Sequence, residues 1–179
     1  ENVKEGDHIK VYVSEVKIMD KGPKIMISRS HPNFVRKLFE SEIPEISDGT
    51  VEIKSVSREA GSRSKIAVFS NNPNVDAVGS CIGSHGSRLS SIIEELGGEK
   101  IDLIEYSDEP EKYVAAALAP ANVIKVEFDP EVPGACRATV PDNQLSLSIG
   151  NRGQNVRLAA KLTGYKIDIH PESGFYGEN

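Results

Sequence analysis

The fold is decided by residues 147–169, which read LSIGNRGQNVRLAAKLTGYKIDI. Two glycines, Gly150 and Gly153, bracket a polar pair between a short apolar segment and a longer segment of helical character. Residues 81–103, which read CIGSHGSRLSSIIEELGGEKIDL, repeat this pattern with Gly83 and Gly86 at one constant offset. After a gap of one residue, both stretches continue into Lys-Ile-Asp. A single Gly-x-x-Gly turn is a weak signal, but two copies with matched flanks predict an internal repeat.

The segments around each glycine pair follow one order: helix, strand, strand, helix, helix, strand. Apolar residues at i, i+3, i+4 and i+7 predict the helices, and β-rich runs predict the strands. In the first copy we expect elements at residues 31–43, 51–56, 65–70, 75–81, 87–96 and 100–106. In the second copy we expect them at 111–118, 123–128, 135–140, 142–149, 154–163 and 166–170. Asp142 is expected to cap its helix. The short connection between the copies predicts that they pack against each other.

Residues 1–30 have the character of β-structure. Alternation over 9–13 and an apolar run over 24–28 predict two strands, joined by a turn at 21–23. Two strands cannot hold a hydrophobic core of their own, so we interpret this segment as the end of a β-domain. The sequence therefore divides into residues 1–30, a first repeat over 31–106, a second repeat over 107–171 and a flexible tail over 172–179.

The composition limits the class of protein. The chain has 179 residues, a formal net charge of −6 and no apolar run of the roughly 18 residues needed to span a bilayer. The N-terminus has neither an initiator methionine nor a signal peptide, so we expect a fragment of a longer cytoplasmic protein. Cys81 and Cys136 fit reduced thiols in that compartment. The acidic total counts only partly against a nucleic-acid partner, because such binding needs a local basic rim.

The Gly-x-x-Gly turns have properties that suit a nucleic-acid backbone. A helix that ends in such a turn and restarts at once needs positive φ angles, which glycine tolerates. Glycine also lets a sugar-phosphate backbone approach the main chain closely. The N–H groups that open the following helix, together with its dipole, favour a phosphate there. Basic side chains would add charge at the rim: Arg88, Arg152, Arg157 and Lys161.

The αββααβ order, with Ile-Gly-x-x-Gly between its paired helices, resembles a KH domain of the bacterial topology, type II. Two tandem copies after a β-segment resemble the NusA family of bacterial transcription elongation, termination and antitermination factors. The resemblance extends from about Gly6 to His170 and rests on segments 57–61, 83–87, 96–102, 141–142 and 150–169. It implies an α+β (α/β) chain of two type II KH domains, preceded by the last strands of an OB-fold β-barrel. The amino-terminal RNA-polymerase-binding domain of that family has no counterpart in this sequence.

The resemblance also implies a function. Single-stranded nascent RNA would cross both KH grooves, each loop clamping about four nucleotides, to modulate pausing, termination and antitermination. RNA polymerase and other transcription factors would be partners of the full-length protein, which would be a monomer with no membrane contact and no cofactor. The residues implied in RNA binding lie in and after the two turns: Ile82, Gly83, Ser84, His85, Gly86, Ser87, Arg88, Ile149, Gly150, Asn151, Arg152, Gly153, Gln154, Asn155, Arg157 and Lys161.

The two turns differ in charge. NusA-family loops usually carry a basic residue in each Gly-x-x-Gly pair. Here the second turn keeps Arg152, whereas the first holds Ser84 and His85. A histidine side chain is mostly uncharged at neutral pH. We therefore expect the second turn to contribute more binding energy, by about 1 kcal/mol, as for a charged hydrogen bond.

Other interpretations are weighed against this one. Neither a nucleophile with its base nor a pair of carboxylates stands out, and the turns lack the Lys-Ser/Thr of a Walker loop, so we expect no enzyme. The histidines show no metal spacing, so we expect no metal site. Degenerate KH copies that act as a protein–protein adaptor are the main alternative. Arg58, Arg63 and Lys65 are equally consistent with a solvated hairpin tip and with an RNA contact.

Overall fold

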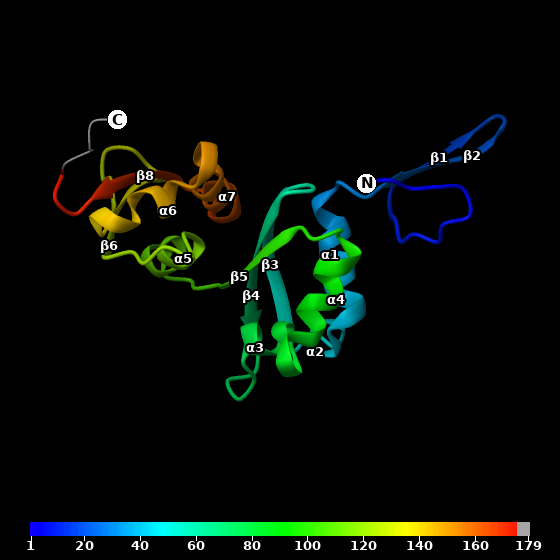
Figure 1. Cartoon of the computed structure of the whole chain (residues 1–179), viewed down its shortest axis with the longest axis horizontal. Coiled ribbons are helices and arrows are strands. Elements are labelled where there is room, and N and C mark those ends of the chain that lie inside the picture. Colours follow the sequence, from blue (N-terminus) through cyan, green and yellow to red (C-terminus); the bar gives the residue numbers. More distant parts are fainter. Residues whose placement is uncertain (175–179) are drawn as a thin grey trace.

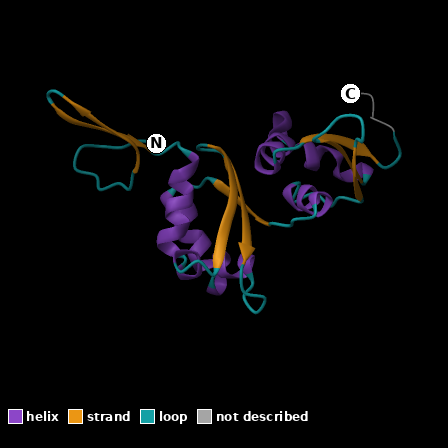
Figure 2. Cartoon of the chain, turned by 180° about the vertical axis from the view of Figure 1, so that it is seen from behind, coloured by secondary structure: helices purple, strands orange, loops and turns teal. Residues whose placement is uncertain are grey.

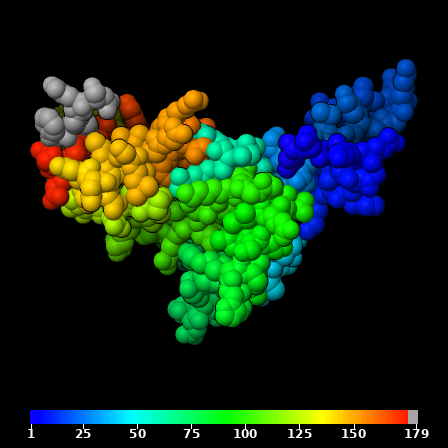
Figure 3. Space-filling model, viewed as in Figure 1, coloured from blue at the N-terminus to red at the C-terminus, as the bar shows by residue number. Residues whose placement is uncertain are grey.

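The computed structural model describes residues 1–174 and is elongated, with three bodies in a row (Figure 1). A β-hairpin near the N-terminus projects from one end, a first α+β unit lies in the centre, and a second forms the other end. The space-filling view shows the two α+β units in continuous contact (Figure 3). Both units follow the predicted αββααβ order of principal elements, so the predicted α+β repeat is confirmed.

The hairpin consists of β1 (Tyr12–Met19) and β2 (Gly22–Ser28), which pair antiparallel. Both strands are placed differently from the prediction: β1 begins later, and the turn is at 20–21, so Gly22 already pairs with Met19. Most of its apolar side chains are exposed, with Ile18 at 92%. The hairpin therefore has no core of its own, as two strands alone predict. Its assignment to an OB-type domain stays a prediction.

The first unit is a three-stranded sheet with helices packed on it. Its elements are α1 (Pro32–Glu42), α2 (Pro44–Ser47), β3 (Val51–Glu59), β4 (Arg63–Ser70), α3 (Ala77–Ile82), α4 (Ser87–Glu95) and β5 (Lys100–Glu105). The strands lie in the order β3-β4-β5, with β3 antiparallel and β5 parallel to β4. Pro44, which the sequence marks as a helix end, also begins the short helix α2, because its fixed φ suits the first helical position.

The second unit repeats this topology. Its elements are α5 (Pro110–Ala117), β6 (Lys125–Phe128), β7 (Ala135–Val140), α6 (Leu145–Ile149), α7 (Gln154–Thr163) and β8 (Lys166–Pro171). The strands lie in the order β6-β7-β8, again with the last pair parallel. In each unit the last strand runs parallel to its neighbour. The two helices that precede it return the chain to the end of the sheet at which the neighbouring strand began.

Two details of the second unit differ from the prediction. The Asp142 side chain does not cap a helix; it lies at the start of the 3-10 turn Asp142–Gln144, and its Oδ1 accepts the Ser173 N–H at 3.0 Å. The Glu172 N–H donates to Val140 O at 2.8 Å. Residues 172–174 are thus held by hydrogen bonds, and the rest of the predicted flexible tail, 175–179, lies outside the described residues.

The second unit packs on the sheet of the first, as predicted. Helices α1, α3 and α4 cover one face of that sheet, and α5 and α7 lie on its other side (Figures 1 and 2). The shared core contains Ala67 and Ile104 of the sheet and Tyr113 and Val114 of α5. Consequently β4 is buried on both faces over residues 63–68, whereas its counterpart β7 has exposed and half-buried positions between buried ones.

Charged side chains on β3 and β4 are buried in ion pairs. The side chains of Arg58 and Glu99 are 4% and 0% exposed, and the Arg58 Nε lies 3.1 Å from the Glu99 Oε2. The Lys65 Nζ is also buried and lies 2.9 Å from Asp102 Oδ2, which Arg63 contacts as well. The strands extend further than predicted, and the turn occupies only residues 60–62. The interpretation of these cations as a solvated tip is therefore wrong, and the interpretation as an RNA contact stays a prediction.

Two further findings bear on the class of protein. Cys81 and Cys136 are free and buried, and burial raises the pKa of Cys81 to about 12 and that of Cys136 to about 11. Such thiols are protonated and inert at neutral pH, in agreement with the expected reduced state. Over residues 1–174, no helix combines the length and apolar character needed to cross a bilayer.

The Arg58–Glu99 pair predicts a large stability effect. Replacement of Glu99 by Ala leaves the Arg58 guanidinium buried without its counter-ion, and we expect a loss of about 3–5 kcal/mol in the free energy of unfolding. Urea denaturation measures it. Glu94→Ala, an exposed position on α4, is the control and should change stability by no more than about 0.5 kcal/mol. Equal effects of the two substitutions would contradict the structural role of the pair.

Candidate nucleic-acid interface

The two Gly-x-x-Gly turns have nearly the same backbone conformation. In the first, between α3 and α4, Gly83 has φ 74° and ψ 177°, and Gly86 has φ 75° and ψ 11°. In the second, between α6 and α7, Gly150 has φ 79° and ψ 170°, and Gly153 has φ 72° and ψ 17°. The repeat seen in the sequence is therefore also a repeat of local structure.

The two glycines of each turn are needed for different reasons. A Cβ on Gly150 would lie 2.7 Å from the backbone nitrogen of Asn155, and a Cβ on Gly83 would lie 2.7 Å from Cγ of Arg88. The first glycine of each turn is thus required by packing as well as by φ. At the second glycine, the nearest heavy atom to such a Cβ would be 3.9 Å away. That position leaves open space through which a ligand backbone could approach the main chain.

The residue before the second glycine also has a positive φ, 51° at His85 and 52° at Arg152. This conformation is uncommon outside glycine. Both residues are exposed. The Arg152 side chain has no ion pair or hydrogen bond to other residues of the described part, 1–174, so its charge is available to a ligand. The first turn offers His85 at the equivalent place.

The other residues predicted around the first turn differ in accessibility. Ile82, the last residue of α3, is 37% exposed. Arg88 is half-buried; its Nη1 lies 2.8 Å from Glu45 Oε2 and donates to Ser80 O at 2.8 Å. The charge of Arg88 is therefore neutralised inside the unit. The exposed residues of this turn are Ser84, His85 and Ser87.

Asn155 is placed differently from the other residues predicted around the second turn. It is fully buried, and its Nδ2 donates to Ser148 O at 2.9 Å and to Leu118 O at 3.0 Å. It supports the turn from inside the unit and does not belong to the exposed contacts that the sequence predicts. The exposed residues of this region are Asn151, Arg152, Arg157 and Lys161, and the half-buried ones are Ile149, Gly150, Gly153 and Gln154.

A carboxylate that the sequence did not single out lies beside the second turn. Glu59, the last residue of β3, accepts from Arg157 Nε at 2.7 Å and from Gln154 Nε2 at 2.8 Å. Gln154 also donates to Ser62 Oγ at 2.8 Å. The hydrogen bonds from Arg157 and Gln154 lower the pKa of Glu59, so it is ionised at neutral pH. No sequence pattern shows this contact, because it depends on how the two units pack.

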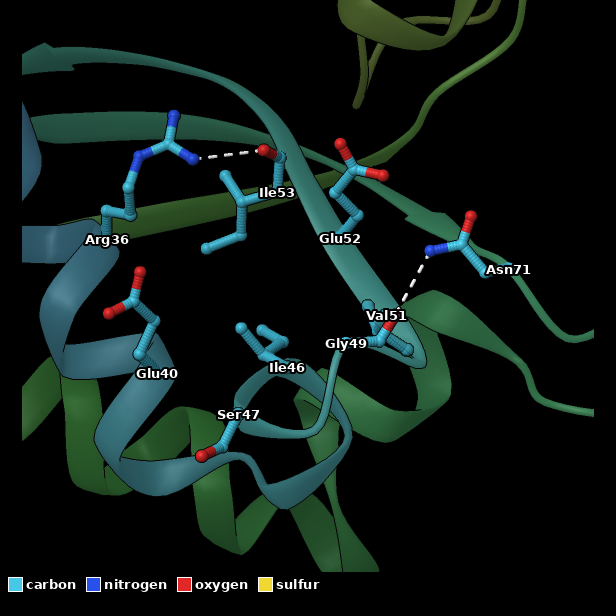
Figure 4. A pocket seen from close by; sticks show the side chains of 9 residues that line it. All are labelled: Arg36, Glu40, Ile46, Ser47, Gly49, Val51, Glu52, Ile53 and Asn71. Carbon is cyan, nitrogen blue, oxygen red and sulfur yellow. Dashed lines mark hydrogen bonds between the residues drawn. The ribbon is translucent and has the colours of Figure 1, made fainter.

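A pocket of about 600 Å³ lies against the N-terminal half of β3, at the sheet edge opposite β5 (Figure 4). Arg36 on one wall donates to Ile53 O at 3.0 Å, and Glu40 and Glu52 also line the pocket. This mixed lining does not suit a phosphate backbone. Nor do the described residues 1–174 contain a cluster of three or more His, Cys, Asp or Glu side chains that could hold a metal ion.

Two family models match the α+β units. A model of the NusA-like first KH domain matches residues 29–106, and a model of the NusA-like second KH domain matches residues 110–176. Each match contains one of the Gly-x-x-Gly turns. The chain belongs to the NusA family. Its first unit, from α1 to β5, is the first KH domain (KH1), and its second, from α5 to β8, is the second (KH2).

Related proteins carry the same family name. The transcription termination/antitermination proteins NusA of Halalkalibacterium halodurans and Bacillus subtilis are 57% and 55% identical over 173 residues. The matches cover 97% of this chain but 45% and 46% of those proteins, so the chain spans less than half their length. A solved structure titled "Crystal structure of APE1850" covers 78% of this chain and 97% of its own, with a TM-score of 0.57 and 22% identity. That likeness shows a shared fold.

The geometry of the second turn predicts that its glycines differ in tolerance. Gly153→Ala places a side chain in open space at positive φ and should cost about 1–2 kcal/mol. Gly150→Ala adds the contact with the Asn155 backbone and should cost roughly 1–3 kcal/mol more. Denaturant unfolding of both variants measures the difference. Equal losses would show that the packing against Asn155 does not constrain the turn.

Proposed function

We propose that this chain is the RNA-binding part of a NusA-type transcription factor. Single-stranded nascent RNA crosses both KH domains, with phosphates at the Gly-x-x-Gly turns and bases between the following helix and β5 or β8. The observation that carries the proposal is the shared conformation of the two turns, each of which opens directly into a helix with no side-chain cap.

The physical chemistry of the turns supports a phosphate ligand. Glycine precedes α4 and α7, so no side chain caps either helix, although the N–H groups of Ser87 and Gln154 already donate to Ser84 O and Asn151 O. The helix dipoles favour an anion at these N-termini. The second glycine of each turn leaves room for a sugar-phosphate backbone, and Ile82 offers an exposed apolar surface for a base.

The two domains contribute unequally in this proposal. In KH2, Arg152 presents an unpaired positive charge at the turn. In KH1, His85 takes that place, and the nearby Arg88 is neutralised by Glu45. A charge-assisted hydrogen bond to phosphate is stronger than a neutral one. KH2 therefore holds the phosphate backbone more tightly.

The names of the relatives support a proposed role for the whole protein. The relatives are named for transcription termination and antitermination. Holding nascent RNA beside RNA polymerase in the cytoplasm would bias pausing and termination, with other transcription factors as partners of the full-length protein. We place the hairpin at the end of an OB-type RNA-binding domain, and we expect this part to act as a monomer. The residues that contact RNA supply only binding and orientation.

Replacement of Gly153 by Asp tests the RNA clamp. The side chain enters the open space of the turn with a charge of the same sign as phosphate, so affinity for single-stranded RNA should fall roughly tenfold or more in a fluorescence titration. Gly49→Asp is a matched control, because Gly49 also has positive φ and open space but lies beside the pocket on β3. Full retention of affinity by Gly153→Asp, or no RNA binding by the unmodified chain, would favour the adaptor function instead.

Arg152→Ala tests the phosphate contact itself. Loss of one contact should reduce the slope of log K against log salt concentration by about 0.7, the value for single strands. Arg137→Ala removes the same charge from an exposed position on β7 and should leave the slope unchanged. An unchanged slope in Arg152→Ala would mean that this side chain does not touch phosphate.

A further inference from the structure

The guanidinium of Arg157 lies over the second turn. Its Nη1 donates to Arg152 O at 3.0 Å and would be 3.9 Å from a Cβ on Gly153. The side chain is 44% exposed. Arg157 is therefore placed to reach a phosphate that approaches the second glycine, in addition to Arg152.

Arg157 is nevertheless occupied by a carboxylate from the other domain. Its Nε and Nη2 lie 2.7 and 2.6 Å from Glu59 Oε1. Gln154 holds the second oxygen of Glu59, which fixes the carboxylate in this position. Figure 3 shows the tip of the β3–β4 hairpin in contact with the segment that follows the second turn. The Nε and Nη2 donors of Arg157, which a phosphate would use, are thus already bonded to the carboxylate of Glu59.

The first turn has no equivalent of this arrangement. At the offset that relates the glycine pairs, Ser90 stands in place of Arg157 and Ser87 in place of Gln154. The two turns still share their backbone angles. The Glu59 contacts are therefore not needed to form the turn, and their main consequence is electrostatic: they make the Arg157–Glu59 pair neutral overall.

We propose, as a refinement that rests on the proposed RNA-binding function, that Glu59 of KH1 masks Arg157 of KH2. Arg157 is a latent phosphate-binding residue, and Glu59 sets how tightly the second turn holds single-stranded RNA. A fixed carboxylate beside the turn repels an incoming phosphate and competes with it for the same guanidinium. The neutral pair also releases no counterion when RNA binds, so it adds nothing to the salt-dependent part of affinity.

The substitution Glu59→Gln removes the mask and preserves the contacts around it. The glutamine oxygen can still accept from Gln154, and exposed ion pairs contribute little to stability, so the domain should stay folded. We expect affinity for a single-stranded RNA oligonucleotide to rise roughly threefold to tenfold, as for one added charge-assisted hydrogen bond partly screened by solvent. The salt slope should become steeper by about 0.7. Glu59→Ala should change affinity in the same direction.

The control and the double variant distinguish this effect from a general change in charge. Glu52→Gln removes the same charge from the same strand, roughly 20 Å from Glu59 by the rise of a strand, where Glu52 pairs with Lys54 at 3.4 Å. It should leave affinity unchanged. In an Arg157→Ala background, Glu59→Gln should give no gain.

The outcomes of the titration show whether the masking fails or the proposed RNA binding itself fails. A Glu59→Gln variant that binds RNA as the unmodified chain does, or more weakly, overturns the masking, as does an equal gain without Arg157. These results leave RNA binding by the unmodified chain intact, so they count against the masking alone. Failure of the unmodified chain to bind RNA would count against the proposed function itself.

Discussion

The contact between the KH1 sheet and the KH2 helices α5 and α7 is the constraint on which the rest of the structure depends. Lys65 shows how closely the domains are joined: its fully buried amine bonds to Asp102 within KH1 and donates to the carbonyl of Ala119 in KH2 at 2.7 Å. A buried ammonium is costly unless it is paired and hydrogen-bonded. Each domain therefore supplies part of the environment that the other requires, and the burial of Ala67 and Ile104 adds to the shared core.

This packing places part of KH1 beside the Gly-x-x-Gly turn of KH2. The tip of the β3–β4 hairpin reaches the start of α7, where Glu59 and Ser62 bond to side chains that follow the second turn. Ser57 adds a buried hydrogen bond to the carbonyl of Leu158 at 2.8 Å. The charge around the second turn is thus set by residues of both domains, although the glycines of that turn belong to KH2 alone.

The two turns share a backbone conformation but differ in charge. Their backbone angles agree within about ten degrees, yet the first presents His85 and the second presents Arg152. Around them, Arg88 and Arg157 are both paired with carboxylates, from Glu45 and Glu59. The net charge of −6 is therefore compatible with RNA binding, because Arg152 stays unpaired at a turn where the helix dipole already favours phosphate.

The sequence by itself determined the repeat, the order of elements and the two turns, because these depend on short-range constraints such as positive φ at glycine and apolar periodicity along a helix. Only the tertiary structure decided which charged residues face a ligand. Arg58 and Lys65 became buried partners, Asn155 became an internal support, and Glu59 came to lie beside a turn almost a hundred residues later in the chain. The reason is that long-range packing sets whether a charge is buried and paired. Residue type and local spacing do not indicate that packing.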